Sequence, residues 1–199
     1  MTLSISRFPD DADKINWVNC QKTVNNSSIW FFSLLALGSF SNVVFTCALP
    51  LVGFGALAST SLSKSKAIIT ILLMWLVNQV IGFTMRDYPL DFSTFAWGVV
   101  ILLGGLLATM FGLFRFERYS SSFRQYLISI FASLMIGYIA YQAMIWVGGA
   151  VLGGLHGFNL AVLWQVFSVN ALWTIALMVV HNVLIAQKLK FSSSVKKIS

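Results

Sequence analysis

The sequence predicts an all-α integral membrane protein, a polytopic bundle of six transmembrane helices whose first segment is irregular and broken at Pro50. Two observations predict this fold. The 199 residues are 58% hydrophobic and only 10% charged, whereas roughly a quarter of the residues in a soluble domain are charged. Long apolar runs fill residues 29–186, and formal charge is confined to the short gaps between them. Lipid rather than water must therefore cover most of the surface.

The chain divides into three regions by composition. Residues 1–28 are expected to form a polar N-terminal tail, partly helical around 13–22, with no apolar core long enough for a cleavable signal peptide. Residues 29–187 form the transmembrane helical domain, and residues 188–199 form a basic C-terminal tail. The length suits one compact helical domain without a second soluble module.

Four segments are long enough to cross a bilayer, since a spanning helix needs about 20 apolar residues. They are 67–84, 94–114, 126–152 and 159–186. The last two exceed the minimum length, so they are expected to tilt or to project beyond the hydrocarbon core.

The region 29–60 allows two interpretations, because Pro50 interrupts it and Gly53 and Gly55 follow. In the first, residues 29–46 cross, the chain breaks at 47–50, and 51–60 returns as a short or irregular helix. That gives six segments with both termini in the cytoplasm. In the second, one long kinked helix crosses once, giving five segments and an outside N-terminus. Arg and Lys in the N-terminal tail favour the first interpretation.

The charged gaps alternate in sign along the chain. Lys64 and Lys66 lie in the first gap, and Arg86, Asp87 and Asp91 lie in the second. The third is rich in arginine, and the fourth, around residue 156, has no formal charge. Because basic loops are retained in the cytoplasm, the first and third gaps and the C-terminus are predicted to be cytoplasmic, in a multi-pass protein of the cell membrane.

Several functional classes lack support in the sequence. The net charge of +7 comes from loops and tails, so contact with the lipid bilayer explains it better than nucleic acid does. Cys20 and Cys47 have no metal-ligand spacing, and His156 and His181 lie at opposite depths, so neither a metal nor a cofactor site is predicted. No catalytic constellation is present, and the chain is not expected to be an enzyme.

Polar residues inside the apolar segments are the candidates for a ligand site. No Asp, Glu, Lys or Arg lies deep in a predicted span, which argues against a proton relay and favours a mostly neutral or amphipathic ligand. The side chains predicted to bind it, converging on one cavity open to the outside, are Asn78, Gln79, Tyr138, Gln142 and Asn170. Tyr138, Tyr141, Gln142 and Trp146 share one helical face, as do Asn170, Thr174 and His181. The alternative role for each group is interhelical hydrogen bonding or packing.

Small residues at four-residue spacing indicate close helix packing. Gly104, Ala108 and Gly112 form such a ridge, which permits close approach either within the bundle or against a partner protein. An exposed ridge without an internal cavity would favour the alternative function, a structural or assembly subunit of a larger membrane complex. A membrane-embedded enzyme acting on lipid or pigment would require a carboxylate or metal beside His181.

The chain resembles the substrate-binding S-component of energy-coupling-factor (ECF) vitamin transporters. The resemblance covers roughly residues 29–190 and rests on a small apolar bundle, an irregular first pair of segments and the lack of deep charges. It implies a scaffold that binds a vitamin or related micronutrient near its outer face. It also implies a partner membrane protein and cytoplasmic ATPases, because this chain has no GxxxxGK[ST] motif. The leading expectation is a small-molecule transport or substrate-binding subunit that depends on partners for energy.

Overall fold

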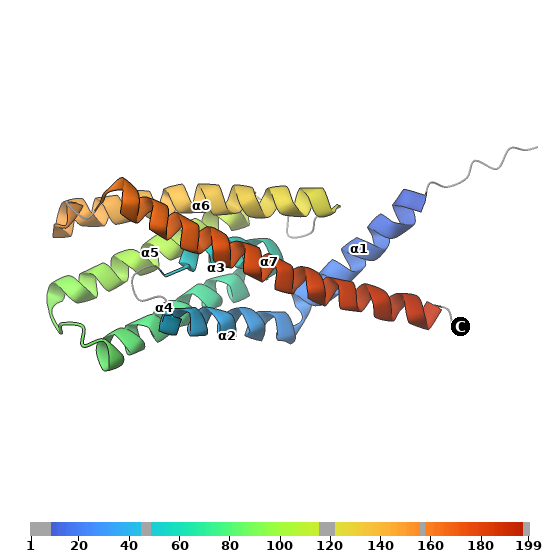
Figure 1. Cartoon of the computed structure of the whole chain (residues 1–199), viewed down its shortest axis with the longest axis horizontal. Coiled ribbons are helices and arrows are strands. Elements are labelled where there is room, and N and C mark those ends of the chain that lie inside the picture. The colour runs from blue at the N-terminus through green and yellow to red at the C-terminus, as the bar shows by residue number, and fades with distance from the viewer. Residues whose placement is uncertain (1–8, 45–48, 116–121, 156–157, 197–199) are drawn as a thin grey trace, which may run out of the picture.

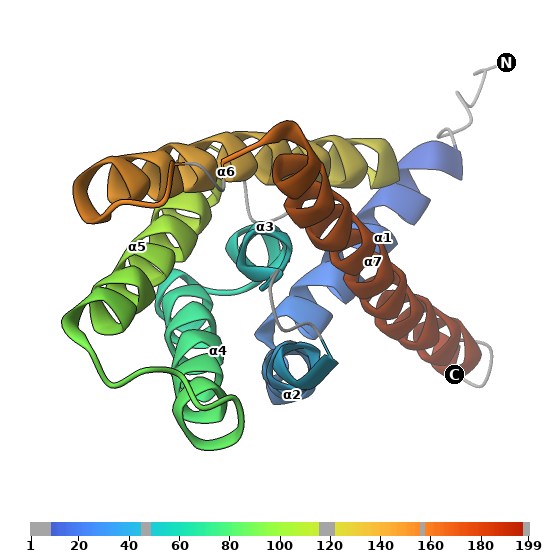
Figure 2. The ribbon, with the colours of Figure 1, turned by 60° about the vertical axis from the view of Figure 1, so that its left-hand side comes forward.

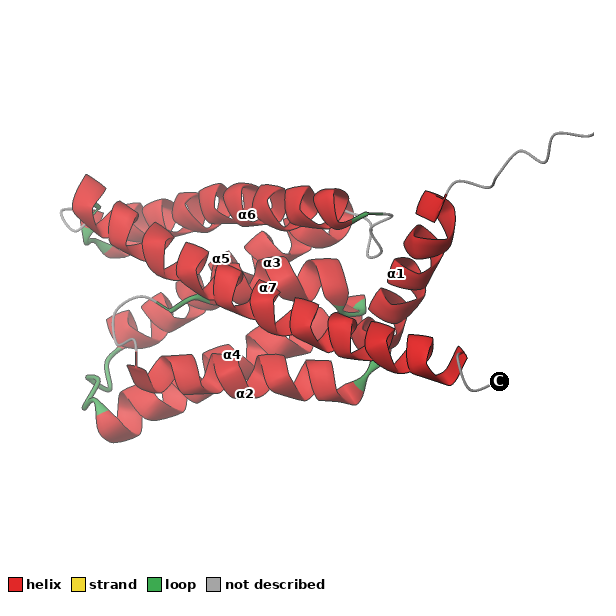
Figure 3. Cartoon of the chain, turned by 45° about the vertical axis from the view of Figure 1, so that its right-hand side comes forward, coloured by secondary structure: helices red, strands yellow, loops and turns green. Residues whose placement is uncertain are grey.

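The computed structural model describes residues 9–44, 49–115, 122–155 and 158–196, and these residues form helices joined by short connections without any strand (Figures 1 and 3). The helices are α1 (Pro9–Asn26), α2 (Ser28–Val44), α3 (Leu51–Ser61), α4 (Lys64–Met85), α5 (Phe92–Arg115), α6 (Phe123–Leu152) and α7 (Leu160–Lys196).

Four of these helices are long and apolar enough to cross a membrane, and they match the four segments predicted from the sequence. They span Lys64–Met85, Phe92–Phe114, Phe123–Leu152 and Leu160–Lys190. Only 28% to 33% of the most apolar stretch of each helix is buried inside the bundle, so their outward faces are apolar surface. The prediction of an all-α membrane protein is confirmed. The count of six spans stays a prediction, because α2 and α3 are shorter than a full span.

The region around Pro50 folds as two separate helices, as in the first of the two interpretations. Pro50 is the N-cap of α3, where its missing N–H and fixed φ angle are tolerated. The break predicted at 47–50 overlaps residues 45–48, which lie outside the described part of the chain. All eleven residues of α3 are buried. Figure 2 shows this short helix at the centre, with α4, α5, α6 and α7 around it.

The small-residue ridge of α5 packs inside the bundle. Gly104 lies against the ring of Tyr141 on α6, where an added Cβ would come within 2.9 Å of Cδ2. Ala108 is 3% exposed and lies opposite Gly137. Gly112 faces serine hydroxyl groups of α3 and α6. The ridge therefore contributes to the contacts of α5 with α3 and α6 and is not an exterior surface.

Helix α1 lies within the segment expected to be a polar tail, and it packs against α7 and α2. A buried network of hydrogen bonds connects α1 to α6 and α7. His181 Nε2 lies 2.8 Å from Asn25 Oδ1, and His181 Nδ1 lies 2.7 Å from the Tyr126 hydroxyl. Trp30 stacks on the imidazole and donates from Nε1 to Ser61 Oγ. A neutral imidazole with its proton on Nε2 satisfies both contacts, because the amide oxygen only accepts and the tyrosine hydroxyl can donate.

The two ends of the bundle differ in charge. The exposed or half-buried basic side chains at one end, termed the basic end, are Lys64, Lys66, Arg124, Lys188 and Lys190. The other end, termed the cavity end, holds the α4–α5 connection with Arg86, Asp87 and Asp91, and the α6–α7 connection (Figure 1). The described charges are thus sorted along the helix axes in the way that the sequence predicts.

Candidate functional site

The α4–α5 connection is held in place by local hydrogen bonds. Asp87 has a φ of 51°, and the Tyr88 N–H then donates back to the Gly82 carbonyl at 3.1 Å. The Tyr88 ring lies so close to Gly82 that any side chain at Gly82 would meet it. Asp91 Oδ1 accepts from the Thr94 N–H at 2.8 Å and caps α5. The hydrogen bonds from Thr94 hold the pKa of Asp91 below its ordinary value.

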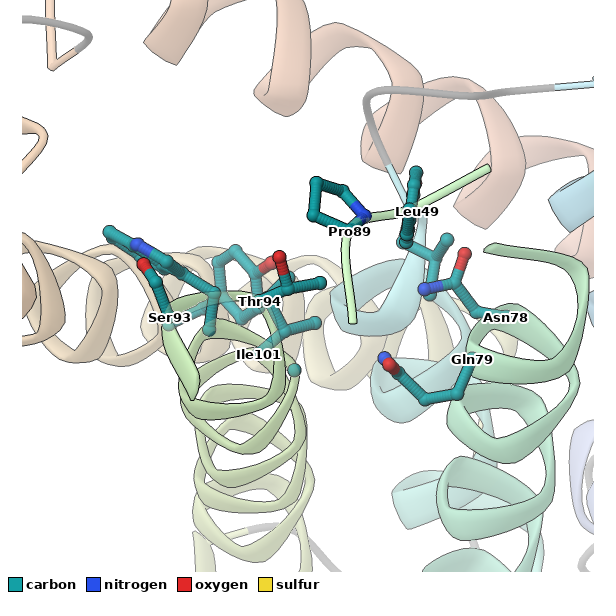
Figure 4. Close-up of a pocket in the computed structure, with 11 residues that line it drawn as sticks. Leu49, Asn78, Gln79, Pro89, Ser93, Thr94 and Ile101 are labelled. Atoms are coloured by element: carbon teal, nitrogen blue, oxygen red, sulfur yellow. The ribbon is translucent and has the colours of Figure 1, made fainter. Parts of the chain in front are cut away.

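A cavity of about 390 Å³ lies beneath this connection, between α4 and α5. Figure 4 shows Asn78 and Gln79 on one wall and Ser93 and Thr94 on the facing wall. Its lining consists of Leu49, Asn78, Gln79, Tyr88, Pro89, Ser93, Thr94, Trp97, Gly98, Ile101 and Tyr141. None of these lining residues has a formally charged side chain, so the described walls offer amide, hydroxyl, aromatic and aliphatic groups. We call this space the amide cavity.

Asn78 is the most unusual group in the amide cavity. Its side chain is 6% exposed, yet within the described residues its carboxamide has no hydrogen-bond partner. The amide atoms are not among the fully buried unpaired atoms of the described residues, so they face the cavity, where water or a ligand can reach them. The neighbouring Gln79 side chain lies over Gly98, where an added Cβ would come within 2.9 Å of Oε1. Gly98 therefore leaves room for the second amide.

A second cavity, of about 290 Å³, adjoins the first. It lies between α5, α6, the α6–α7 connection and α7, and is mostly apolar. Its lining consists of Trp97, Ile101, Tyr141, Gln142, Ile145, Gly149, Gly154, Leu155, Phe158, Val162, Leu163 and Val166. Among these described lining residues, Gln142 supplies the carboxamide. We call this space the apolar cavity.

The five side chains predicted to bind a ligand do not meet in one cavity. Asn78 and Gln79 line the amide cavity, and Gln142 lines the apolar cavity. Tyr138 lines neither cavity, and its hydroxyl donates to the Leu163 carbonyl at 2.6 Å. Asn170 also lines neither cavity. The predicted convergence is therefore limited to three side chains in two adjoining spaces.

Asn170 is instead part of the packing of α3. It is fully buried, and its Oδ1 accepts from the Gly53 N–H at 2.9 Å while its Nδ2 donates to the Val166 carbonyl at 2.8 Å. The first N–H groups of a helix have no partner within that helix, so Asn170 satisfies one of them from α7. An added Cβ at Gly53 would come within 2.6 Å of the Asn170 carbonyl oxygen. Close approach of the two helices makes this contact possible.

Several cavity residues were missed by reasoning from the sequence. On α5, Thr94, Trp97, Gly98 and Ile101 line the amide cavity at offsets of three, four and seven, a spacing that places them on one helical face. That spacing could have identified these residues from the sequence. The contribution of Tyr88 could not have been predicted, because it depends on how the connection folds back onto Gly82.

Within the described residues, no three His, Cys, Asp or Glu side chains are grouped so that they could hold a metal ion. His156, one of the two histidines considered in the sequence, lies outside this part of the chain. No protein-family model, curated protein or solved structure matches the chain significantly. The site is therefore interpreted from its geometry and chemistry.

Proposed function

We propose that this multi-pass membrane protein is a small-molecule transport or substrate-binding subunit whose ligand occupies the amide cavity. The observation that supports the proposal most strongly is the carboxamide of Asn78, which lines that cavity and has no hydrogen-bond partner among the described residues. Buried polar groups are nearly always hydrogen-bonded in folded proteins. The Asn78 carboxamide is open to the cavity, so its partner there is water or a ligand.

The chemistry of the walls favours a ligand without formal charge. A buried ion requires a counter-charge or several hydrogen bonds, and the described lining residues of the amide cavity offer no charged side chain. The rings of Tyr88, Trp97 and Tyr141 provide flat apolar surface beside the amides. A mostly neutral or amphipathic molecule fits this combination.

In this proposal the basic end faces the cytoplasm and the cavity end faces outward. Basic connections are retained on the cytoplasmic side of the cell membrane, and the described basic side chains at one end follow that rule. The amide cavity then receives its ligand from outside the cell. The sequence has no phosphate-binding loop, so energy for transport would come from partner proteins, as the resemblance to ECF S-components also implies.

The assembly-subunit alternative is less well supported by the packing. It required the ridge of Gly104, Ala108 and Gly112 to lie on the exterior, and these residues are buried. It also required that the bundle lack a cavity, whereas the described residues line two that are partly open.

Native mass spectrometry of the full-length protein, extracted in lipid nanodiscs, tests the proposal. We expect a small molecule bound to the wild-type chain and at least a tenfold lower occupancy in Asn78→Leu, because the substitution removes the amide but keeps the volume. Gln165→Leu is the matched control, since Gln165 is an exposed amide on α7 outside both cavities. Wild-type protein without any bound small molecule, or equal occupancy in all three proteins, would contradict the proposal.

A further inference from the structure

The amide and apolar cavities share one wall. Trp97, Ile101 and Tyr141 line both. The Tyr141 side chain is 7% exposed, and its ring lies directly over Gly104, where an added Cβ would approach Cδ2 within 2.9 Å. Because Gly104 has no side chain, the ring lies at the junction between the two spaces.

The two cavities differ in chemical character. The amide cavity presents two carboxamides and two hydroxyl groups, from Asn78, Gln79, Ser93 and Thr94. The apolar cavity is lined by aliphatic and aromatic side chains of α6, α7 and their connection, with Gln142 as its described amide. Both spaces have mostly apolar walls, and a continuous site that passes from the first into the second would lose most of its hydrogen-bonding groups along its length.

We propose that both cavities hold one ligand, an uncharged amphiphile with a hydrogen-bonding head in the amide cavity and an apolar tail in the apolar cavity. The inference rests on the proposed function and specifies its ligand class. Ligand cavities typically measure about 300–1,000 Å³, so the amide cavity, about 390 Å³, lies near the lower end of that range and the apolar cavity, about 290 Å³, lies just below it. The tail lies between α6 and α7, beside Val162 and Val166.

The head is an amide, a lactam or a similar group that offers a donor and an acceptor side by side. The Asn78 carboxamide carries both a donor and an acceptor, and both are available to a ligand because neither has a partner among the described residues. A single complementary amide satisfies both at once. A charged head would lack a counter-ion among the described lining side chains.

Binding of three probes to the full-length chain in lipid nanodiscs tests this inference. The probes are benzamide, which has the head alone, octylbenzene, which has the tail alone, and 4-octylbenzamide, which has both. Empty nanodiscs measure the partition of each probe into lipid. We expect saturable binding of 4-octylbenzamide to the wild-type chain, at least tenfold tighter than that of either other probe.

Two kinds of variant locate the head and the tail. Val166→Trp is expected to fill the apolar cavity and to reduce the affinity for 4-octylbenzamide to that for benzamide, with benzamide binding unchanged. Val162→Trp, at a 43% exposed position on the rim of the same cavity, provides the same test if the first variant folds poorly. Asn78→Leu is expected to weaken both benzamide probes at least tenfold. Val179→Trp, on the exposed face of α7, is the control that should change nothing.

The outcomes separate this inference from the proposed function. Equal affinities for benzamide and 4-octylbenzamide, both lost in Asn78→Leu, would overturn the two-part ligand and leave a ligand of the amide cavity alone. The absence of saturable binding by 4-octylbenzamide, or binding insensitive to Val166→Trp and Val162→Trp, would also overturn it. In each of these cases native mass spectrometry of Asn78→Leu still decides the proposed function by itself.

Discussion

At the residue scale, two buried asparagines have opposite roles. Asn170 is fully buried and hydrogen-bonded to Gly53 on α3, whereas Asn78 is nearly as buried and, among described residues, unpaired. The sequence could place both inside apolar segments but could not separate their roles. The distinction depends on contacts between residues that are 117 positions apart, which no local pattern encodes.

The first prediction compares these two positions. We expect Asn170→Leu to lower the free energy of unfolding by about 1–3 kcal/mol, because it leaves the buried Gly53 N–H without an acceptor. Asn78→Leu should leave stability equal to or above that of the wild type, since it removes an amide that makes no hydrogen bond within the described residues. Denaturant titration of both variants in the same detergent, without ligand, measures the difference. Equal destabilisation by the two substitutions would contradict the assigned roles.

The second prediction concerns two buried tyrosines on α6. Tyr126→Phe should cost about 1–2 kcal/mol, because the Tyr126 hydroxyl lies 2.7 Å from Nδ1 of the buried His181. Tyr141→Phe is the matched control, because within the described residues the Tyr141 hydroxyl has no hydrogen-bond partner, and its stability should stay within about 0.5 kcal/mol. The same unfolding measurement tests both. If Tyr126→Phe left the free energy of unfolding unchanged, the His181 network would not stabilise the docking of α1.

At the element scale, α3 organises the bundle. The sequence predicts a break at Pro50 but leaves open whether the following residues return as a short helix or belong to one long kinked helix. The sequence could not predict that α3 is buried on all sides. A short apolar run has the same composition and periodicity whether lipid or protein surrounds it. The small residues of α5 likewise indicated close packing without indicating which helix they would contact.

The third prediction tests this packing. Gly112→Val should lower the free energy of unfolding by about 1–3 kcal/mol, because Gly112 lies against serine side chains of α3 and α6 that leave no room for a larger residue. Ala143→Val, at an exposed position on α6, adds similar bulk where there is space and should be close to neutral. Thermal unfolding in a common detergent compares them. If Gly112→Val left the free energy of unfolding unchanged, the ridge would not be closely packed inside the bundle.

At the scale of the whole molecule, hydropathy and charge predicted more than any motif did. The four full-length segments appear as helices whose membrane-crossing stretches begin or end within a few residues of the predicted bounds, because lipid exposure requires continuous apolar runs. The cavity was predicted only in part. Asn78 and Gln79 were predicted from the sequence, but Ser93 and Thr94 were missed, and the shape of the cavity depends on how α4 and α5 and their connection meet.

The fourth prediction concerns orientation. In a background with both native cysteines replaced by serine, Ser93→Cys at the cavity end should react with a membrane-impermeant maleimide in intact cells. Lys190→Cys at the basic end should react only after permeabilisation, because basic segments stay in the cytoplasm. Both positions are exposed on the described bundle, so access depends on the membrane alone. The reverse labelling pattern would contradict an outward-facing cavity.

The most direct measurement of the central claim is an experimental structure of the full-length protein isolated with its native lipids and ligands. The account predicts non-protein density within hydrogen-bonding distance of the Asn78 carboxamide, beside Trp97 in the amide cavity. In Asn78→Leu, solved in the same way, that density should be lost while the helices keep their positions. A wild-type structure in which Asn78 bonds to another part of the chain and the cavity is closed would contradict the account.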